Sequence, residues 1–139
     1  MQHRKIGTTR MKTMRNGKTN NLTLNDLFVQ QMMNQDKMLQ DGMYDDYKMN
    51  GTECVPVDDV RLASYHIQHL VSEIGEVLDA DKRWKNFRNE KYDKDAKVEE
   101  LADCFIVLMN IAMYSGINGR EMTEAIKEKL DKVSKRINL

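Results

Sequence analysis

The sequence predicts an all-α fold with four helices in one domain. Its 139 residues are enough to bury one core but too few for two ordinary domains. Only one proline and seven glycines interrupt the chain, and residues that favour helices, such as Met, Lys, Glu and Leu, are abundant. Four segments also carry apolar residues at helical spacing. These observations assign residues 21–139 to a single helical domain.

The first helix is expected from about residue 23 to residue 40. Thr23 is a suitable N-cap, and Asp26 stands three residues later in place of the usual Glu or Gln of a capping box. Apolar side chains follow at helical spacing: Leu24, Leu27, Phe28, Met32 and Leu39. Residues 41–58 contain Gly42, Gly51 and Pro56 and predict a long loop of functional length.

The second helix is expected from about residue 59 to residue 84, with Asp58 or Asp59 as its cap. At 100° per residue, its apolar side chains gather on one side. These are Ile67, Leu70, Ile74, Val77 and Leu78. Glu73 and Glu76 lie at the edge of this stripe. His69 and His66 continue the same edge one and two turns earlier, respectively.

The third helix is expected from about residue 95 to residue 114. Between Leu101 and Met113 its apolar residues point in nearly every direction, which is typical of a helix surrounded by protein. We therefore expect it to be central or to lie at a subunit interface. Glu100, Asp103 and Asn110 nevertheless share one narrow polar sector, and buried carboxylates need partners or a metal.

Gly116 is expected to end the third helix, and a last helix from residue 119 to residue 137 is expected to pack over it. Cys104 reads as a small buried hydrophobic residue. It is widely separated from Cys54 and no CxxC occurs, so the sequence indicates neither a disulfide framework nor a zinc site.

The balanced formal charge conceals an uneven distribution. Residues 1–20 carry six basic side chains and no acidic one, which leaves 16 basic and 22 acidic side chains in the remainder. The six are Arg4, Lys5, Arg10, Lys12, Arg15 and Lys18. We expect a flexible N-terminal arm here. A nucleic-acid-binding arm is the alternative, but aromatic interleaving and a known motif are both missing.

No run of about 18 apolar residues occurs, so we expect no membrane-spanning helix. No signal-peptide core follows the N-terminus either. These two observations predict an intracellular protein, most simply a cytoplasmic one.

Two acidic doublets are the most informative feature of the chain. Glu73 and Glu76 stand in SEIGEV, and Glu100 and Asp103 stand in VEELADCF. Partners three residues apart on a helix share one face, about 5 Å from each other. Four carboxylates from two helices can therefore converge. Hard cations neutralise such a cluster, and Mg²⁺ prefers oxygen ligands.

Two other metal chemistries fit the residues less well. A ferritin-like di-iron site needs Glu-x-x-His doublets, but Ile106 follows Asp103 at that spacing. A site that recruits His66 and His69 with Glu73 would favour Mn²⁺ or Zn²⁺. Lone imidazoles on a helix edge are more often ordinary side chains at the core boundary. An all-oxygen Mg²⁺ site that binds a polyphosphate is the remaining option, with Mn²⁺ as its alternative metal.

The two doublets, separated by 23 residues, resemble the signature of the all-α nucleoside triphosphate pyrophosphohydrolases, which include MazG-type enzymes and the dimeric dUTPases. The segment DKRWK, from Asp81 to Lys85, is similar to the Lys-x-Trp-Lys element of the dimeric dUTPases. The resemblance covers about residues 60–115. It implies a four-helix fold and Mg²⁺-dependent cleavage of a deoxynucleoside triphosphate, dUTP first, to the monophosphate and pyrophosphate.

The resemblance also implies roles for individual residues. Glu73, Glu76, Glu100 and Asp103 would ligate the metal, and Glu73 or Glu76 would act on the attacking water. Lys82 and Lys85 would balance phosphate charge, with Arg83 or Arg88 as substitutes. Trp84 would stack on a base or cap the core. In the first helix Gln31 and Asn34, or Gln35 alone, would read the base, and Asn110 would bind the sugar or a water.

Members of this superfamily assemble as dimers or tetramers, so the resemblance implies a homodimer or a homotetramer. A reading of a different class is a helical interaction protein without catalytic activity, which would bind nucleic acid through the basic arm and carry acidic residues only for solubility. Dependence of activity on a metal separates the two readings.

Overall fold

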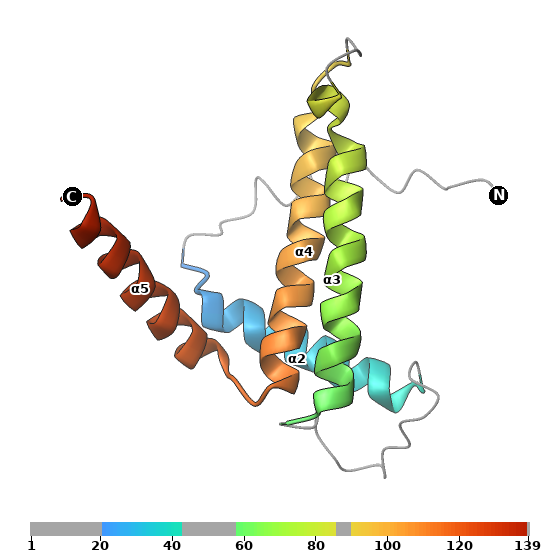
Figure 1. The fold of residues 1–139 in the computed structure, drawn as a ribbon. Helices are drawn as coiled ribbons and strands as arrows, with labels where there is room; N and C mark the ends of the chain where they lie inside the picture. Colours follow the sequence, from blue (N-terminus) through green and yellow to red (C-terminus); the bar gives the residue numbers. More distant parts are fainter. Residues whose placement is uncertain (1–20, 43–57, 86–89, 139) are drawn as a thin grey trace.

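A computed structural model shows four α-helices, one short 3-10 helix and no strand within the residues it describes, which are 21–42, 58–85 and 90–138 (Figure 1). The helices are α2 (Leu24–Gln40), α3 (Val60–Ala80), α4 (Lys94–Tyr114) and α5 (Gly119–Arg136), with η1 (Lys82–Trp84) between α3 and α4. The predicted all-α class is confirmed. The basic arm, Cys54, Arg88 and most of the long loop lie outside the described residues.

Helix α2 begins with the predicted capping box. The Thr23 hydroxyl accepts a hydrogen bond from the Asp26 backbone N–H, and the Asp26 carboxylate accepts one from the Thr23 N–H. The buried face of α2 differs from the predicted apolar stripe, because Leu27 and Met32 are exposed. The buried residues are Phe28, Gln31, Gln35 and Leu39. Two amides thus occupy a face that hydrophobicity alone assigns to Leu and Met.

Helices α3 and α4 lie side by side and antiparallel over most of their length (Figure 1). Asp59 caps α3 by accepting a hydrogen bond from the Leu62 N–H, and its own N–H donates to the Tyr114 carbonyl at the end of α4. Gly116 follows α4 with φ 76°, a left-handed conformation that favours glycine, so the predicted helix end is confirmed. Cys104 is buried within α4, as expected.

Helix α5 packs on α2 rather than over α4. A side chain at Gly119 would meet Asn25 and Phe28 of α2 at 2.8 Å, which explains a glycine at the start of this helix. Met122 joins a small core that contains Phe28 and Met113. Beyond that turn α5 projects away from the α3–α4 pair (Figure 1), so the expectation that it covers α4 is wrong.

Much of the apolar surface of α3 and α4 stays exposed in the single chain. Val71 is 69% exposed, and Ile67, Ile74 and Leu78 extend the same row along α3. On α4, Phe105 is 66% exposed. Within the described residues, helix α4 is therefore not surrounded by protein from its own chain. The other expectation from its sequence, a position at a subunit interface, stays a prediction.

Among the described residues no single helix is long and apolar enough to cross a membrane. Helices α4 and α5 taken together have the length and composition of a membrane-spanning segment, but their axes are bent relative to each other by 113°.

Candidate functional site

The four acidic residues of the two doublets meet across the α3–α4 pair. Carboxylate oxygens of Glu73, Glu76 and Glu100 all lie within 4.8 Å of one another. Asp103 lines the adjoining cavity together with Glu73. Within the described part of the chain, this group of possible metal ligands contains carboxylates only. An all-oxygen set suits a hard divalent cation such as Mg²⁺.

The carboxylates are close enough to perturb one another. Burial raises the pKa of Glu100, and its hydrogen bond with Glu76 and the neighbouring negative charges raise this pKa further. Burial and the charge of Glu76 also raise the pKa of Asp103, although His69 opposes that change. A bound cation would relieve this repulsion, because it stabilises the charged form of each carboxylate.

His69 contacts Glu73 directly. Its Nε2 lies 2.7 Å from the Glu73 carboxylate, one helical turn away on α3. Its Nδ1 is buried and has no hydrogen-bond partner among the described residues. His66 is 2% exposed, and its Nδ1 faces Asn110 rather than the acidic group. The two histidines thus belong to different contacts, which argues against the site built from both.

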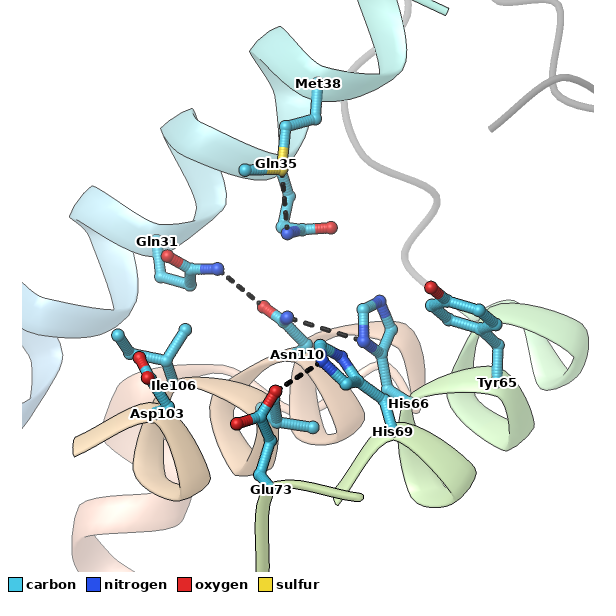
Figure 2. Close-up of a pocket in the computed structure, with 11 residues that line it drawn as sticks. Gln31, Gln35, Met38, Tyr65, His66, His69, Glu73, Asp103, Ile106 and Asn110 are labelled. Carbon is cyan, nitrogen blue, oxygen red and sulfur yellow. Dashed lines mark hydrogen bonds and ion pairs between the residues drawn. The ribbon is translucent and has the colours of Figure 1, made fainter. Parts of the chain in front are cut away.

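A cavity of about 280 Å³ connects the acidic group with helix α2 (Figure 2). Its polar walls come from three helices: Gln31 and Gln35 of α2, His66, His69 and Glu73 of α3, and Asp103 and Asn110 of α4. Figure 2 shows the amides and the carboxylates facing the same space. The structure therefore brings Gln31 and Asn110, two of the predicted binding residues, together with two predicted metal ligands.

Asn34 occupies a different position from Gln31. It is exposed and donates a hydrogen bond from Nδ2 to the Gln31 Oε1 at 3.2 Å. Gln35, the sequence alternative to this pair, is 3% exposed and lines the cavity. Asn34 thus supports Gln31 from outside, whereas Gln31 and Gln35 form the wall.

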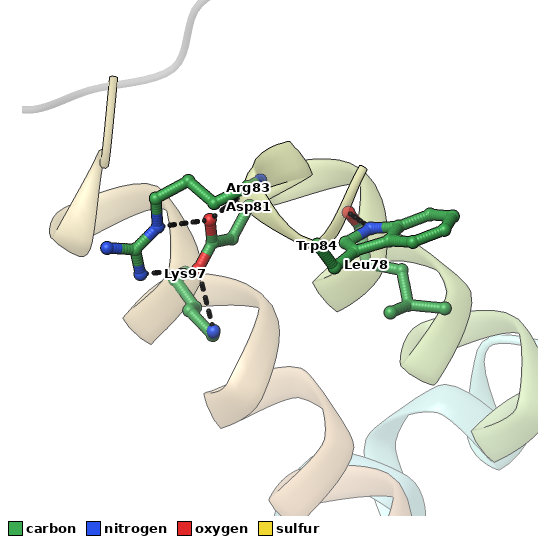
Figure 3. A network of polar contacts seen from close by, with 5 residues as sticks. All are labelled: Leu78, Asp81, Arg83, Trp84 and Lys97. Carbon is green, nitrogen blue, oxygen red and sulfur yellow. Dashed lines mark hydrogen bonds and ion pairs between the residues drawn. The ribbon is translucent and has the colours of Figure 1, made fainter. Parts of the chain in front are cut away.

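The basic segment after α3 is held in place by a buried carboxylate (Figure 3). Asp81 accepts two hydrogen bonds from the Arg83 guanidinium and one from Lys97 of α4, all at 2.8 Å. These cations lower the pKa of Asp81. Arg83 also lies over the Tyr92 ring at 3.7 Å. Because Arg83 is engaged twice, Lys82 and Lys85 are better placed to receive an anion.

Trp84 does not cap the core of this chain. Its side chain is 55% exposed, and its Nε1–H donates to the Leu78 carbonyl at 3.1 Å. Lys85 Nζ lies 5.2 Å from the centre of the ring. The indole is therefore a fixed, outward-facing aromatic surface, available to a ligand or to another subunit.

A comparison with protein families decides which group of proteins this arrangement belongs to. The family model described as dUTPase matches residues 15–138, a range that includes all four helices and the whole site. The chain belongs to this dUTPase family. Comparisons with curated proteins and with solved structures gave no significant match. Membership in the dUTPase family places the protein among the nucleotide hydrolases, and it bears out the resemblance seen in the sequence.

One residue of this dUTPase-family site, Tyr114, and one pairing, that of His66 with Asn110, are not apparent from motifs. Tyr114 is fully buried, and its hydroxyl donates to the Gln35 Oε1 at 2.8 Å. His66 stands seven residues before Glu73, and Asn110 stands seven residues after Asp103. Because α3 and α4 are antiparallel, these equal steps lead to the same end of the pair. The heptad spacing was thus a signal that could have paired His66 with Asn110.

Proposed function

We propose that this dUTPase-family protein is a Mg²⁺-dependent pyrophosphohydrolase that converts a deoxynucleoside triphosphate, dUTP first, to the monophosphate and pyrophosphate. The observation that supports the proposal most directly is the shared cavity, in which Gln31 and Asn110 face the same space as Glu73 and Asp103. Amides suit the edge of a base, and carboxylates suit the cations that accompany phosphates. A nucleotide carries a base at one end and phosphates at the other, so its binding site needs amides and carboxylates no further apart than the length of the nucleotide.

Glu73, Glu76 and Glu100 would hold the metal, with Asp103 completing the set from α4. Their oxygens within 4.8 Å of one another fit a small oxygen-preferring cation, with Mn²⁺ as an alternative to Mg²⁺. The bound metal would supply Lewis acidity toward the phosphates and lower the pKa of a water. The raised pKa values of Glu100 and Asp103 are consistent with ligands that are crowded until a cation is bound.

In the reaction a water oxygen attacks the α-phosphorus, and the bond from that phosphorus to the oxygen bridging to the β-phosphate breaks. Pyrophosphate leaves with that oxygen. Glu73 or Glu76 orients the water and accepts its proton. The contact with His69 restrains the Glu73 carboxylate, so His69 acts through Glu73. Lys82 and Lys85 balance the charge of the phosphates at the η1 end of the hairpin.

The substrate would lie along the α3–α4 pair. Its base would occupy the amide end of the cavity, near Gln31 and Gln35, and Asn110 would contact the base or the sugar. The triphosphate would extend past Glu73 and Glu76 toward η1, since both the carboxylates and the basic segment lie in that direction along α3. Trp84 would add an aromatic surface at the outer end.

We further propose that two or more copies assemble as a homodimer or a homotetramer. The row formed by Ile67, Val71, Ile74 and Leu78 runs along one side of α3 and is about half or more exposed at each position. Such a row is longer than the scattered apolar residues of an ordinary surface. Sedimentation should show an oligomer, and Val71→Arg should shift it toward the monomer. Ser72→Arg adds the same charge at an exposed position of α3 outside this row and serves as the comparison, and equal sizes for Val71→Arg and wild type would reject this face.

The decisive experiment incubates the protein with a panel of deoxynucleoside triphosphates and Mg²⁺ and measures pyrophosphate release. We expect dUTP turnover that stops with a chelator and that is lost in Glu73→Gln and Asp103→Asn. If no nucleotide is cleaved, the enzyme proposal fails. In that case a salt-sensitive DNA complex that disappears on deletion of residues 1–20 would favour the interaction protein.

A further inference from the structure

A buried polar cluster lies at the end of the cavity away from η1, where α2 crosses α3 and α4. Its members are all less than 10% exposed: Gln31, Gln35, His66, Asn110 and Tyr114. None of them belongs to the group of carboxylates proposed to hold the metal. A core at this position could be apolar, so polar side chains here need a reason beyond packing.

The hydrogen bonds of this cluster run in one direction (Figure 2). The Asn34 side-chain Nδ2 donates to the Gln31 Oε1, and the Gln31 Nε2 donates to the Asn110 Oδ1 at 2.8 Å. The Asn110 Nδ2 then faces the His66 Nδ1 at 3.5 Å. Every amide has a carbonyl end and an NH₂ end, so a chain of amides can run either way. Here the direction of the amide chain depends on whether the His66 Nδ1, at the end of the chain, accepts or donates a hydrogen bond.

An imidazole nitrogen without a proton can only accept. When His66 is neutral with its proton on Nε2, Nδ1 requires a donor, and Asn110 must present its NH₂ group. Burial, with a smaller contribution from His69, lowers the pKa of His66 from 6.5 to about 4, so the ring is neutral near pH 7. With the proton of this neutral ring on Nε2, Asn110 turns its carbonyl toward Gln31 and Gln31 donates to it, which is the arrangement in the structure.

The second glutamine of α2 is also held in one orientation. The Tyr114 hydroxyl donates to the Gln35 Oε1 at 2.8 Å, and the Gln35 Nε2 lies 3.4 Å from the Met38 sulfur. A thioether sulfur can accept but not donate, which sets the direction of this amide. The Tyr114 ring stacks on His66 with centroids 5.3 Å apart and planes 3° from parallel. His66 therefore also positions the tyrosine that holds Gln35.

The direction of an amide decides which pyrimidine edge it fits. A 4-oxo pyrimidine such as uracil presents an acceptor at C4 beside a donor at N3, and a 4-amino pyrimidine such as cytosine presents a donor beside an acceptor. A side-chain amide offers one donor and one acceptor side by side. If it can reverse, it fits both edges, but in one orientation it fits only one.

We propose that His66 is a positioning residue for base selection: its Nδ1 fixes the direction of the Asn110–Gln31 amide chain, and this direction lets the cavity distinguish 4-oxo from 4-amino pyrimidines. The inference rests on the proposed function, because it requires the base of the substrate to enter this cavity. His66 acts through the two amides and touches neither the metal ligands nor the reacting phosphate.

The test compares kcat/KM for dUTP and dCTP in wild type and in His66→Phe, which keeps a ring against Tyr114 but lacks Nδ1. We expect the ratio of the two values to move toward one by roughly tenfold, mainly through KM, because a correctly oriented pair of hydrogen bonds discriminates between bases by about that factor. The concentration of Mg²⁺ at half-maximal rate should not change. Ile106→Ala alters an apolar wall of the same cavity and should affect both substrates alike.

A second measurement does not depend on activity or on the folding of a variant. Nitrogen-15 NMR of the wild-type imidazole at pH 7 should show a neutral His66 with its proton on Nε2. A proton on Nδ1 would overturn the inference, as would an unchanged dUTP-to-dCTP ratio in His66→Phe. If wild type cleaves neither nucleotide, the proposed function itself fails, and base selection by His66 fails with it.

Discussion

The two ends of the α3–α4 pair use the same helix geometry for opposite purposes. At one end, Glu73 and Asp103 belong to a partly exposed group of carboxylates that repel one another. Two helical turns away, His66 and Asn110 form a buried neutral contact. The acidic end gathers negative charges that a cation would neutralise, whereas the amide end satisfies its hydrogen bonds within the protein. The comparison suggests that one end does chemistry and the other recognises the substrate.

The largest effect should come from removing a carboxylate at the acidic end. We expect Glu73→Gln to lower kcat more than about 100-fold, since even changes to groups that only support a metal ligand cost up to about that factor. Pyrophosphate release at saturating dUTP measures it. Glu99→Gln removes the same charge beside the site but outside the group of possible ligands, and its rate should stay within about fivefold of wild type. Equal losses in the two variants would contradict the assignment.

At the amide end the effect should appear in KM instead. Asn110→Leu leaves the Gln31 amide without its buried partner, which costs about 1–3 kcal/mol and should raise KM by about tenfold or more. Steady-state kinetics with a parallel Mg²⁺ titration tests this. Asn34→Ala breaks only the exposed link to Gln31 and should have a smaller effect. A fall in Mg²⁺ affinity in Asn110→Leu would show that the two ends are not separate.

Acid should affect the two ends in opposite directions. The pKa of His66 is lowered to about 4, so the unfolded chain takes up that proton first and stability falls between pH 6.5 and about 4, by up to about 3 kcal/mol. The pKa values of Glu100 and Asp103 are raised, so the folded, metal-free protein binds their protons more tightly and gains stability as the pH falls through those values.

Chemical denaturation of the metal-free protein across this pH range separates the two contributions. His66→Phe should abolish the loss of stability, and Asp103→Asn should reduce the gain and stabilise the metal-free protein at neutral pH. If the stability of His66→Phe falls between pH 6.5 and pH 4 as steeply as that of wild type, the result would contradict the burial of a neutral imidazole at His66.

The smallest effect is expected beyond the acidic end, in the basic segment. Lys85→Ala should raise KM by up to about fivefold, because an exposed charge contributes at most about 1 kcal/mol to an ionic contact. The effect should shrink at high salt. Lys91→Ala removes an exposed charge outside this segment and should leave KM unchanged. If both substitutions raise KM equally, Lys85 acts through the overall positive charge of the surface and not through a contact with the phosphates.

Helix positions and caps were predictable because they depend on local patterns. Thr23 with Asp26 indicated the start of α2, and Gly116 indicated the end of α4. The direction of α5 was not predictable, since an amphipathic helix carries no record of which neighbour it covers. The buried face of α2 was also missed, because Gln31 and Gln35 are buried only through hydrogen bonds to residues about 80 positions away.

The sequence by itself determined that two acidic doublets share helix faces, because a spacing of three residues settles the face of a helix. It also determined the family, because the match spans nearly the whole chain. Only the tertiary structure decided which residues lie opposite one another. Pairing Glu76 with Glu100 and His66 with Asn110 depends on the register of two antiparallel helices and on the placement of α2 across them. That register follows from packing and from the connection between helices, which periodicity within one helix does not encode.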